Sequence, residues 1–180
     1  MRMKVWDRAV RVLHWTLVLS LAGATLSLWW LGKLHQPAGY VALAAVALRL
    51  LWGAWFAPRA GYARFVQFVR SPRAALAYLR LLLRHHEPRY IGHNPLGGWM
   101  VLALMLCVTG LGLTGWLYTT DWLWGDEQVE RVHVALAWTL GGLVSLHLAG
   151  VVFTSLRHGE NLVAAMLSGD KRAPTEGDIT

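Results

Sequence analysis

Cysteine is almost absent from this chain, and its scarcity excludes several kinds of chemistry. The single cysteine, Cys107, cannot form an internal disulfide bond. No Cys-x-x-Cys-His sequence is present, which excludes covalent attachment of a c-type haem by the usual motif. No catalytic residue stands out in the sequence either, so its function has to be sought among other residue types.

Charge is scarce as well. Charged residues make up 15% of the 180 residues, and hydrophobic residues make up 56%. A soluble domain of this size does not need so much apolar surface. The 11 tryptophans point the same way, because Trp gathers at membrane interfaces. The net charge of +7 could suggest nucleic acid, but the basic residues lie between long apolar runs, so we predict a membrane protein without a nucleic-acid partner.

Four apolar runs reach the length of about 20 residues that a bilayer span needs. They cover residues 12–31, 38–57, 96–118 and 132–156. With their ends included, the predicted transmembrane helices cover residues 6–32, 37–57, 96–119 and 131–157. The first run resembles a signal peptide cleaved near Ala22-Gly23-Ala24, but its long core favours a retained span. The expected fold is an all-α membrane bundle of four transmembrane helices, a single domain over residues 1–172, with a disordered tail over 173–180.

The basic residues predict the orientation of the chain in the membrane. They gather before the first span, between the second and third spans, and after the fourth span. The loop over residues 119–130 is instead acidic. By the positive-inside rule, both termini and the middle loop face the cytoplasm, and the acidic loop faces outward.

The middle loop contains a predicted helix of its own. Ser71 is a typical N-cap, and Pro72 suits the first helical position. Two faces then follow at helical spacing, one with Arg73, Arg80 and Arg84 and one with Leu76, Leu79 and Leu83. This pattern predicts a cytoplasmic amphipathic helix lying on the membrane surface, between the second and third spans. The alternative is a solvated helix packed under the bundle.

Four histidines fall at two predicted depths. His133 and His147 are 14 residues apart, about 21 Å along one face of the fourth helix. His35 begins the second span at the outer level, and His14 lies early in the first span. For His14 to lie at the same depth as His147, the first helix must start near Trp6. Ionisable side chains are costly inside a membrane. The pairs His35 with His133 and His14 with His147 fit two haem irons, each held between two imidazoles from different helices.

Two competing roles for these histidines are weaker. Zinc or copper would need a carboxylate or thiolate to complete its ligand set, and neither lies at either level. A single histidine in a span is more often a satisfied core residue than a ligand. Four of them at two matched levels favour haem.

Arg49 adds to this pattern. It lies 14 residues after His35, on the same helix face and near the inner level. An arginine inside the membrane needs an anionic partner, and the spans contain no acidic residue. A haem propionate would serve as that partner. A phospholipid headgroup or a snorkelling side chain are the alternatives.

Several segments together resemble the bacterial cytochrome b561 family and the related Ni-hydrogenase cytochrome b subunits. They are Arg11-Val12-Leu13-His14-Trp15, His35 with Gly39, Arg49-Leu50-Leu51-Trp52-Gly53, Tyr90-Ile91-Gly92-His93-Asn94-Pro95-Leu96-Gly97, the His133 and His147 pair, His158 to Met166, and Gly169-Asp170-Lys171-Arg172. The resemblance implies that the four histidines ligate two b haems in the bacterial inner membrane. It also implies electron exchange with membrane quinone or quinol at one end and with a redox partner at the other.

Two further sites are expected from this resemblance. His93 and Asn94 lie beside the inner level and could hydrogen-bond a quinone carbonyl, or could instead cap the third span or hold a propionate. The outer loop carries Trp122 and Trp124 among acidic residues. It could dock a periplasmic c-type cytochrome, hydrogenase or dehydrogenase subunit, or its tryptophans could simply anchor the interface.

Two alternative functions stay open. A quinone-dependent superoxide oxidase would need a basic outer surface to attract the anion, and this outer loop is acidic. A haem-free membrane anchor would hold a partner enzyme without redox activity. His85, His86 and His158 flank arginines at the cytoplasmic surface and are interpreted as solvated or headgroup-facing residues, not as ligands.

Overall fold

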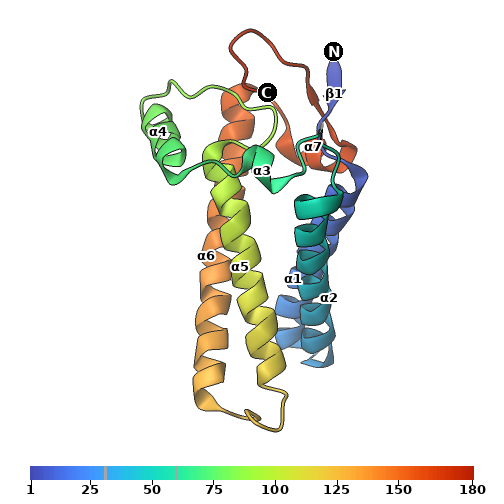
Figure 1. Cartoon of the computed structure of the whole chain (residues 1–180). Helices are drawn as coiled ribbons and strands as arrows, with labels where there is room; N and C mark the ends of the chain where they lie inside the picture. Colours follow the sequence, from blue (N-terminus) through green and yellow to red (C-terminus); the bar gives the residue numbers. More distant parts are fainter. Residues whose placement is uncertain (31, 60) are drawn as a thin grey trace. The chain divides into compact units, whose positions relative to one another are not determined.

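A computed structural model describes residues 1–30, 32–59 and 61–180, which are mainly helical (Figure 1). Four long helices carry the apolar runs. They are α1 (Arg8–Trp30), α2 (His35–Leu51), α5 (Pro95–Leu117) and α6 (Glu127–His158). Each is long and apolar enough to cross a membrane, α2 together with the flanking turns η1 (Gly32–Leu34) and η2 (Trp52–Phe56). The prediction of four spanning helices is therefore confirmed by their length and composition.

Helix α1 begins well before its histidine. The carboxylate of Asp7 accepts a hydrogen bond from the backbone N–H of Val10 at 2.7 Å, which caps the first turn. The helix therefore starts at Arg8, two residues after the start near Trp6 that the matching of levels calls for. The predicted end of this span, at Leu31, lies outside the described residues.

Helix α6 starts at Glu127, four residues before the predicted boundary at residue 131. The carboxylate of Asp126 accepts hydrogen bonds from the backbone N–H groups of Gln128 and Val129, both at 2.9 Å. Glu127 and Glu130 occupy the first turn, where negative charge stabilises the helix dipole. Hydropathy alone places these charged residues in the loop, although they form the capped, solvated start of the helix.

Short elements complete the chain. They are β1 (Arg2–Lys4), α3 (Phe65–Phe68), α4 (Pro72–Leu83), α7 (Leu162–Ser168) and β2 (Asp170–Arg172). Ser71 caps α4 by accepting a hydrogen bond from the N–H of Ala74 at 3.3 Å, as the sequence predicts. The strands β1 and β2 pair antiparallel, with Met3 opposite Lys171, and Figure 1 shows β1 beside the C-terminal segment. This small sheet departs from the all-α prediction, because three-residue strands leave no periodic pattern.

The chain forms two compact units. The first comprises Met1–Arg11, Leu51–Leu102 and Leu146–Thr180, and the second comprises Val12–Leu50 and Ala103–Ser145. The core of the first unit contains Val5, Trp6 and Ile91, which joins the chain's beginning to the segment before α5. In the second unit, a Cβ added at Gly112 of α5 would lie 2.9 Å from Leu43 of α2, so glycine permits this close approach.

The predicted single domain over residues 1–172 and disordered tail over 173–180 stay predictions. The backbone of the tail nevertheless makes specific contacts within the first unit. The N–H of Ile91 donates to the carbonyl of Ile179, and the N–H of Ile179 donates to the carbonyl of Arg89, at 2.9 and 2.8 Å. These bonds tie the end of the chain to the segment that leads into α5.

Candidate functional site

The structure brings the two predicted outer histidines together. His35 is the first residue of α2, and His133 lies one and a half turns into α6. Their ring centroids are 6.1 Å apart, with an angle of 71° between the ring planes. A metal-bound imidazole nitrogen lies about 2 Å from its ion, so two rings on opposite sides of one ion would have centroids roughly 6 Å apart. The observed separation suits two imidazoles that share one metal ion.

Hydrogen bonds orient both rings. The Nδ1 of His35 lies 2.9 Å from the carbonyl oxygen of Ala24, which can only accept, so Nδ1 carries the proton. The Nδ1 of His133 lies 2.9 Å from the hydroxyl oxygen of Thr114. That hydroxyl donates its one proton to the carbonyl of Gly110 at 2.8 Å, and therefore accepts from Nδ1–H of the ring.

This arrangement leaves the Nε2 atom of each ring with the available lone pair. Metal-ligating histidines usually donate their other ring N–H to an oxygen in this way, which fixes the tautomer and the ring orientation. Ala24 and Thr114 were not anticipated from the sequence. The sequence offers one signal for Thr114. It lies four residues after Gly110 in a predicted helix, a spacing at which a threonine hydroxyl can donate to the backbone carbonyl.

The donor set discriminates between metal groups. Within the described residues, no three His, Cys, Asp or Glu side chains gather as a metal-binding cluster. Two imidazoles alone do not complete the four-ligand shell of a structural zinc ion. They would suffice to hold a haem, because its porphyrin supplies the other ligands of the iron. The residues of the outer pair therefore fit haem better than a bare ion.

The inner histidines are each half-buried on a long helix. His147 lies on the same half-buried stripe of α6 as His133, together with Leu136, Leu140 and Val144. Among the described residues of α6 none is fully buried, so side-chain packing covers this stripe only in part. His14 of α1 is half-buried and meets Trp15 edge-on, with ring centroids 5.5 Å apart. The two inner histidines belong to different units, and their pairing stays a prediction.

Arg49 of α2 is buried. Its exposed fraction is 7%, and it continues the buried stripe of Ala42, Ala45 and Val46 along α2. Burial of a guanidinium in an apolar helix is costly unless polar or anionic groups solvate it. The pairing of Arg49 with a haem propionate stays a prediction.

His93 and Asn94 lie at the start of α5. The side-chain oxygen of Asn94 accepts a hydrogen bond from the N–H of Gly97 at 2.7 Å, so Asn94 acts as a helix cap. The His93 ring contacts the rings of Trp6 and Phe68, with centroids 4.8 and 4.5 Å apart. Tyr78 of α4 also hydrogen-bonds Asn94, and burial, with the nearby Glu87 charge, raises the pKa of Tyr78 to about 12. The tyrosine therefore stays protonated at neutral pH.

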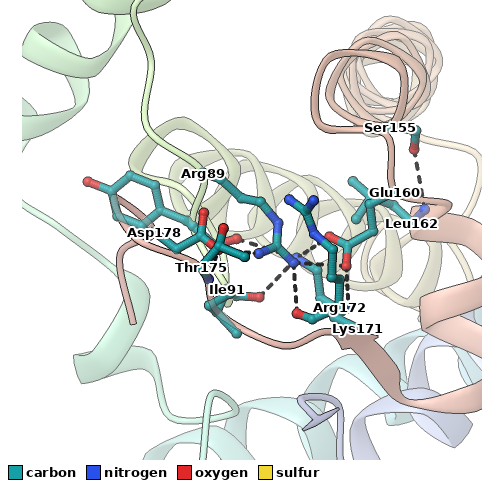
Figure 2. Close-up of polar contacts among 10 residues, drawn as sticks. Arg89, Ile91, Ser155, Glu160, Leu162, Lys171, Arg172, Thr175 and Asp178 are labelled. Atoms are coloured by element: carbon teal, nitrogen blue, oxygen red, sulfur yellow. Dashed lines mark hydrogen bonds and ion pairs between the residues drawn. The ribbon is translucent and has the colours of Figure 1, made fainter. Parts of the chain in front are cut away.

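A cluster of ion pairs that the sequence did not reveal surrounds Arg89, four residues before His93. Figure 2 shows Arg89 between Asp178, at 2.5 Å, and Glu160, at 3.0 Å, with a third hydrogen bond to the carbonyl of Arg172 at 2.9 Å. Lys171 adds a second cation 3.4 Å from Glu160. The side chains of all four ionic residues are nearly inaccessible, so the cluster clasps the C-terminal segment to the chain before α5.

Hydrogen bonds lower the pKa of both carboxylates in this cluster. Burial by itself would raise the pKa of Glu160, but hydrogen bonds from the Arg172 backbone and the Arg89 side chain lower it below the usual range. Asp178 behaves alike, because hydrogen bonds from the Thr175 backbone and from Arg89 outweigh burial and lower its pKa. Both carboxylates are therefore ionised at neutral pH.

The remaining predicted residues are placed at the surface. Trp122 and Trp124 are 94% and 74% exposed in the turn before α6. His85 and His86 are exposed after α4, and His158 is half-buried at the end of α6. The interpretation of the last three as residues that are not ligands stays a prediction.

Similarity to known proteins bears on the membrane fold and the cofactor of this chain. The chain matches no curated protein and no solved structure. It does match the family model described as prokaryotic cytochrome b561, over residues 5–169. This range includes all four candidate spans and the four histidines. Membership implies a multi-pass membrane protein of a bacterium that binds haem b. The chain thus belongs to the prokaryotic cytochrome b561 family.

Proposed function

We propose that this protein is a di-haem b cytochrome that carries electrons across the bacterial inner membrane, between the quinone pool and a periplasmic redox partner. The observation that carries the proposal is the outer histidine pair, with rings 6.1 Å apart and both Nδ1 atoms engaged by oxygen. Family membership supports haem b as the cofactor. Haem b held in this way supplies reversible one-electron chemistry.

The protein's own residues have defined tasks in this function. His35 and His133 would hold the outer haem through Nε2, while Ala24 and Thr114 fix the two rings. His14 and His147 would hold the inner haem. Because His133 and His147 are 14 residues apart on one helix, the two haem levels are about 21 Å apart. Arg49 would neutralise a propionate near the inner level.

The start of α5 is our candidate for the quinone site. His93 offers a ring nitrogen that can donate a hydrogen bond to a quinone carbonyl or take a proton from a quinol hydroxyl. Asn94 uses its oxygen as the cap of α5, which leaves its amide N–H₂ as the group that can donate. His93 is half-buried and lies at the basic end of the bundle, so protons would exchange with the cytoplasm.

The topology follows the charge distribution. We place both termini and α4 at the cytoplasmic side, with α4 as the amphipathic helix between the second and third spans. The turn before α6 faces the periplasm. Trp122 and Trp124 project there beside Asp121, and this exposed acidic and aromatic surface would receive a c-type cytochrome, hydrogenase or dehydrogenase subunit.

A reduced-minus-oxidised visible spectrum of the purified, haem-supplied protein tests the function. We expect a b-type α-band and two haems per chain, and oxidation of the reduced haems by an added quinone analogue. Absence of the α-band would refute the electron-transfer function and favour a haem-free anchor. A single haem per chain would refute the di-haem arrangement while leaving the outer site intact.

A further inference from the structure

We propose that the exposed face of helix α4 binds the headgroups of anionic phospholipids at the cytoplasmic surface of the membrane. This inference rests on the proposed topology, but it does not depend on haem or quinone binding. It names the ligand of the arginine-bearing face of α4. The sequence alone leaves open whether this helix lies on the membrane or is solvated under the bundle.

Helix α4 uses one face to pack on the protein. Ala75 and Tyr78 are buried, and the Tyr78 ring meets the Tyr90 ring edge-on, with centroids 5.5 Å apart. This contact fixes the rotation of the helix about its axis. The opposite face is therefore turned away from the protein.

That opposite face carries three exposed arginines. Arg73, Arg80 and Arg84 fall within about 40° of one another around the helix axis. Helix α4 contains no acidic residue. In the part of the chain that the structure describes, none of these three arginines forms an ion pair. The cluster thus presents a concentrated positive charge that is not neutralised within the protein.

Exposed leucines border the arginines. Leu76 and Leu83 are 49% and 73% exposed on one side, and Leu81 is 40% exposed on the other. A helix that faced only water would expose these apolar side chains without benefit. Arginines flanked by leucines are instead typical of a helix at the boundary between headgroups and acyl chains.

Contacts at both ends hold α4 at the depth where the spans end. Before α4, the carbonyl of Arg70 accepts a hydrogen bond from the indole N–H of Trp99, in the second turn of α5, at 3.0 Å. After α4, the carbonyl of His85 accepts a hydrogen bond at 2.6 Å from Arg157, in the last turn of α6. Tryptophan and arginine at helix ends mark the membrane interface.

Figure 1 shows α4 near these ends of α5 and α6. Since the helix is held there at both of its ends, its basic face lies within reach of the lipid headgroups. Each arginine near an anionic membrane surface strengthens association by roughly fivefold, and the effect decays within a Debye length of about 10 Å at 0.1 M salt. Charge complementarity therefore favours anionic over zwitterionic lipid.

Hydrogen exchange of the full-length protein in nanodiscs tests the proposal. Two lipid compositions are compared, phosphatidylcholine alone and phosphatidylcholine with phosphatidylglycerol, at low and high salt. We expect the amides of α4 to exchange several-fold more slowly in the anionic discs at low salt. The triple variant Arg73→Gln, Arg80→Gln, Arg84→Gln should lose this difference, while replacement of the same three residues by lysine should keep most of it.

A matched control removes three exposed arginines elsewhere in the same unit. The variant Arg2→Gln, Arg8→Gln, Arg59→Gln should retain the lipid dependence of α4. Equal exchange in the two lipids, or lipid dependence that survives the glutamine variant of α4, would overturn the proposal. So would slower exchange that appears only on addition of poly-glutamate, which would assign the face to an acidic protein. The haem spectrum of the same samples reports separately on the proposed electron-transfer function.

Discussion

At the scale of single residues, an oxygen atom fixes the orientation of each outer histidine ring. His133 donates Nδ1–H to Thr114, and His35 donates Nδ1–H to the carbonyl of Ala24. Both partners are ordinary residues in an apolar sequence, and neither would be selected as functional by residue type. Their role becomes visible only when the bonded atoms are considered together.

Thr114 provides the first test at this scale. In Thr114→Val the ring of His133 loses the acceptor for Nδ1–H, so its tautomer and orientation are no longer fixed. We expect a 10- to 100-fold loss of affinity at the outer haem site, roughly the cost of removing such a partner from other metal-bound histidines. Haem titration of the apo-protein measures the affinity. Thr114→Ser should restore it, and a valine variant with unchanged affinity would contradict the role of this hydroxyl.

The second test concerns the predicted inner ligand. His147→Ala should remove one haem per chain and leave the outer haem, because His35 and His133 do not depend on it for their contact. Haem content and the reduced spectrum measure the result. His158→Ala, on the same helix and outside both pairs, is the control and should keep both haems. Loss of both haems in the His147 variant would show that the assignment of ligands to levels is wrong.

At the scale of elements, local signals located the long helices, whereas their capped ends and the small sheet required spatial contacts. Asp7 and Asp126 determine where α1 and α6 begin. The pairing of β1 with β2 joins residues about 170 positions apart, and no local pattern predicts it. The clasp around Arg89 likewise joins three distant segments (Figure 2).

Removal of Arg89 tests the clasp. Arg89→Ala removes the cation that pairs with the buried carboxylates of Glu160 and Asp178. Removal of one partner of a buried ion pair typically lowers the free energy of unfolding by about 3–5 kcal/mol. We expect a lower thermal unfolding temperature in detergent and faster tryptic cleavage after Lys171 and Arg172. Lys4→Ala breaks the exposed pair with Asp170 and should cost about 0–1 kcal/mol. Equal effects of the two changes would argue against a structural role for the clasp.

The clasp should also open in acid. The pKa values of Glu160 and Asp178 are lowered in the folded protein, so each contributes stability above its unfolded pKa, near 4, and loses it as pH falls through the folded value. Burial lowers the pKa of Lys171 from its ordinary value. We expect constant protection of the Ile179 amide between about pH 6 and 8, and loss of protection below about pH 4.

Hydrogen exchange corrected for its intrinsic pH dependence measures this opening. Asp178→Asn removes one of the two titrating groups and should weaken the acid response. A protection profile that is flat down to the acid unfolding of the whole protein would show that the clasp does not titrate independently.

At the scale of the whole molecule, the distribution of charge along the chain predicts an orientation in the membrane. The N-terminal segment, the segment around α4 and the tail carry the arginines, and the turn before α6 carries the acidic residues. Because an orientation is a property of the chain in a membrane, labelling in intact cells is its direct test. Cys107 is buried, so it should contribute little background.

Two introduced cysteines test this orientation. Asp126→Cys should react with a membrane-impermeant maleimide in intact cells, because its turn is predicted to face the periplasm. Thr180→Cys should react only after the cells are broken open. The reverse pattern would invert the proposed positions of the quinone site and the partner surface.

The sequence by itself determined the four spans, the cap of α4 and the placement of His133 and His147 on one face of α6. These features arise from contacts within a few residues, which hydropathy and helical periodicity express directly. It also sufficed to identify the family, because the spaced histidines and the segment before α5 form a specific combination.

Only the tertiary structure decided which atoms complete these features. It brought His35 to His133, gave each ring an oxygen partner, and buried Arg89 among residues of the tail. Such contacts join positions between 11 and 98 residues apart, and their formation depends on how helices pack and not on local propensity. Contacts of the segments before and after α4 also hold this helix at the ends of α5 and α6. That placement is the basis for proposing that its arginines bind anionic lipid.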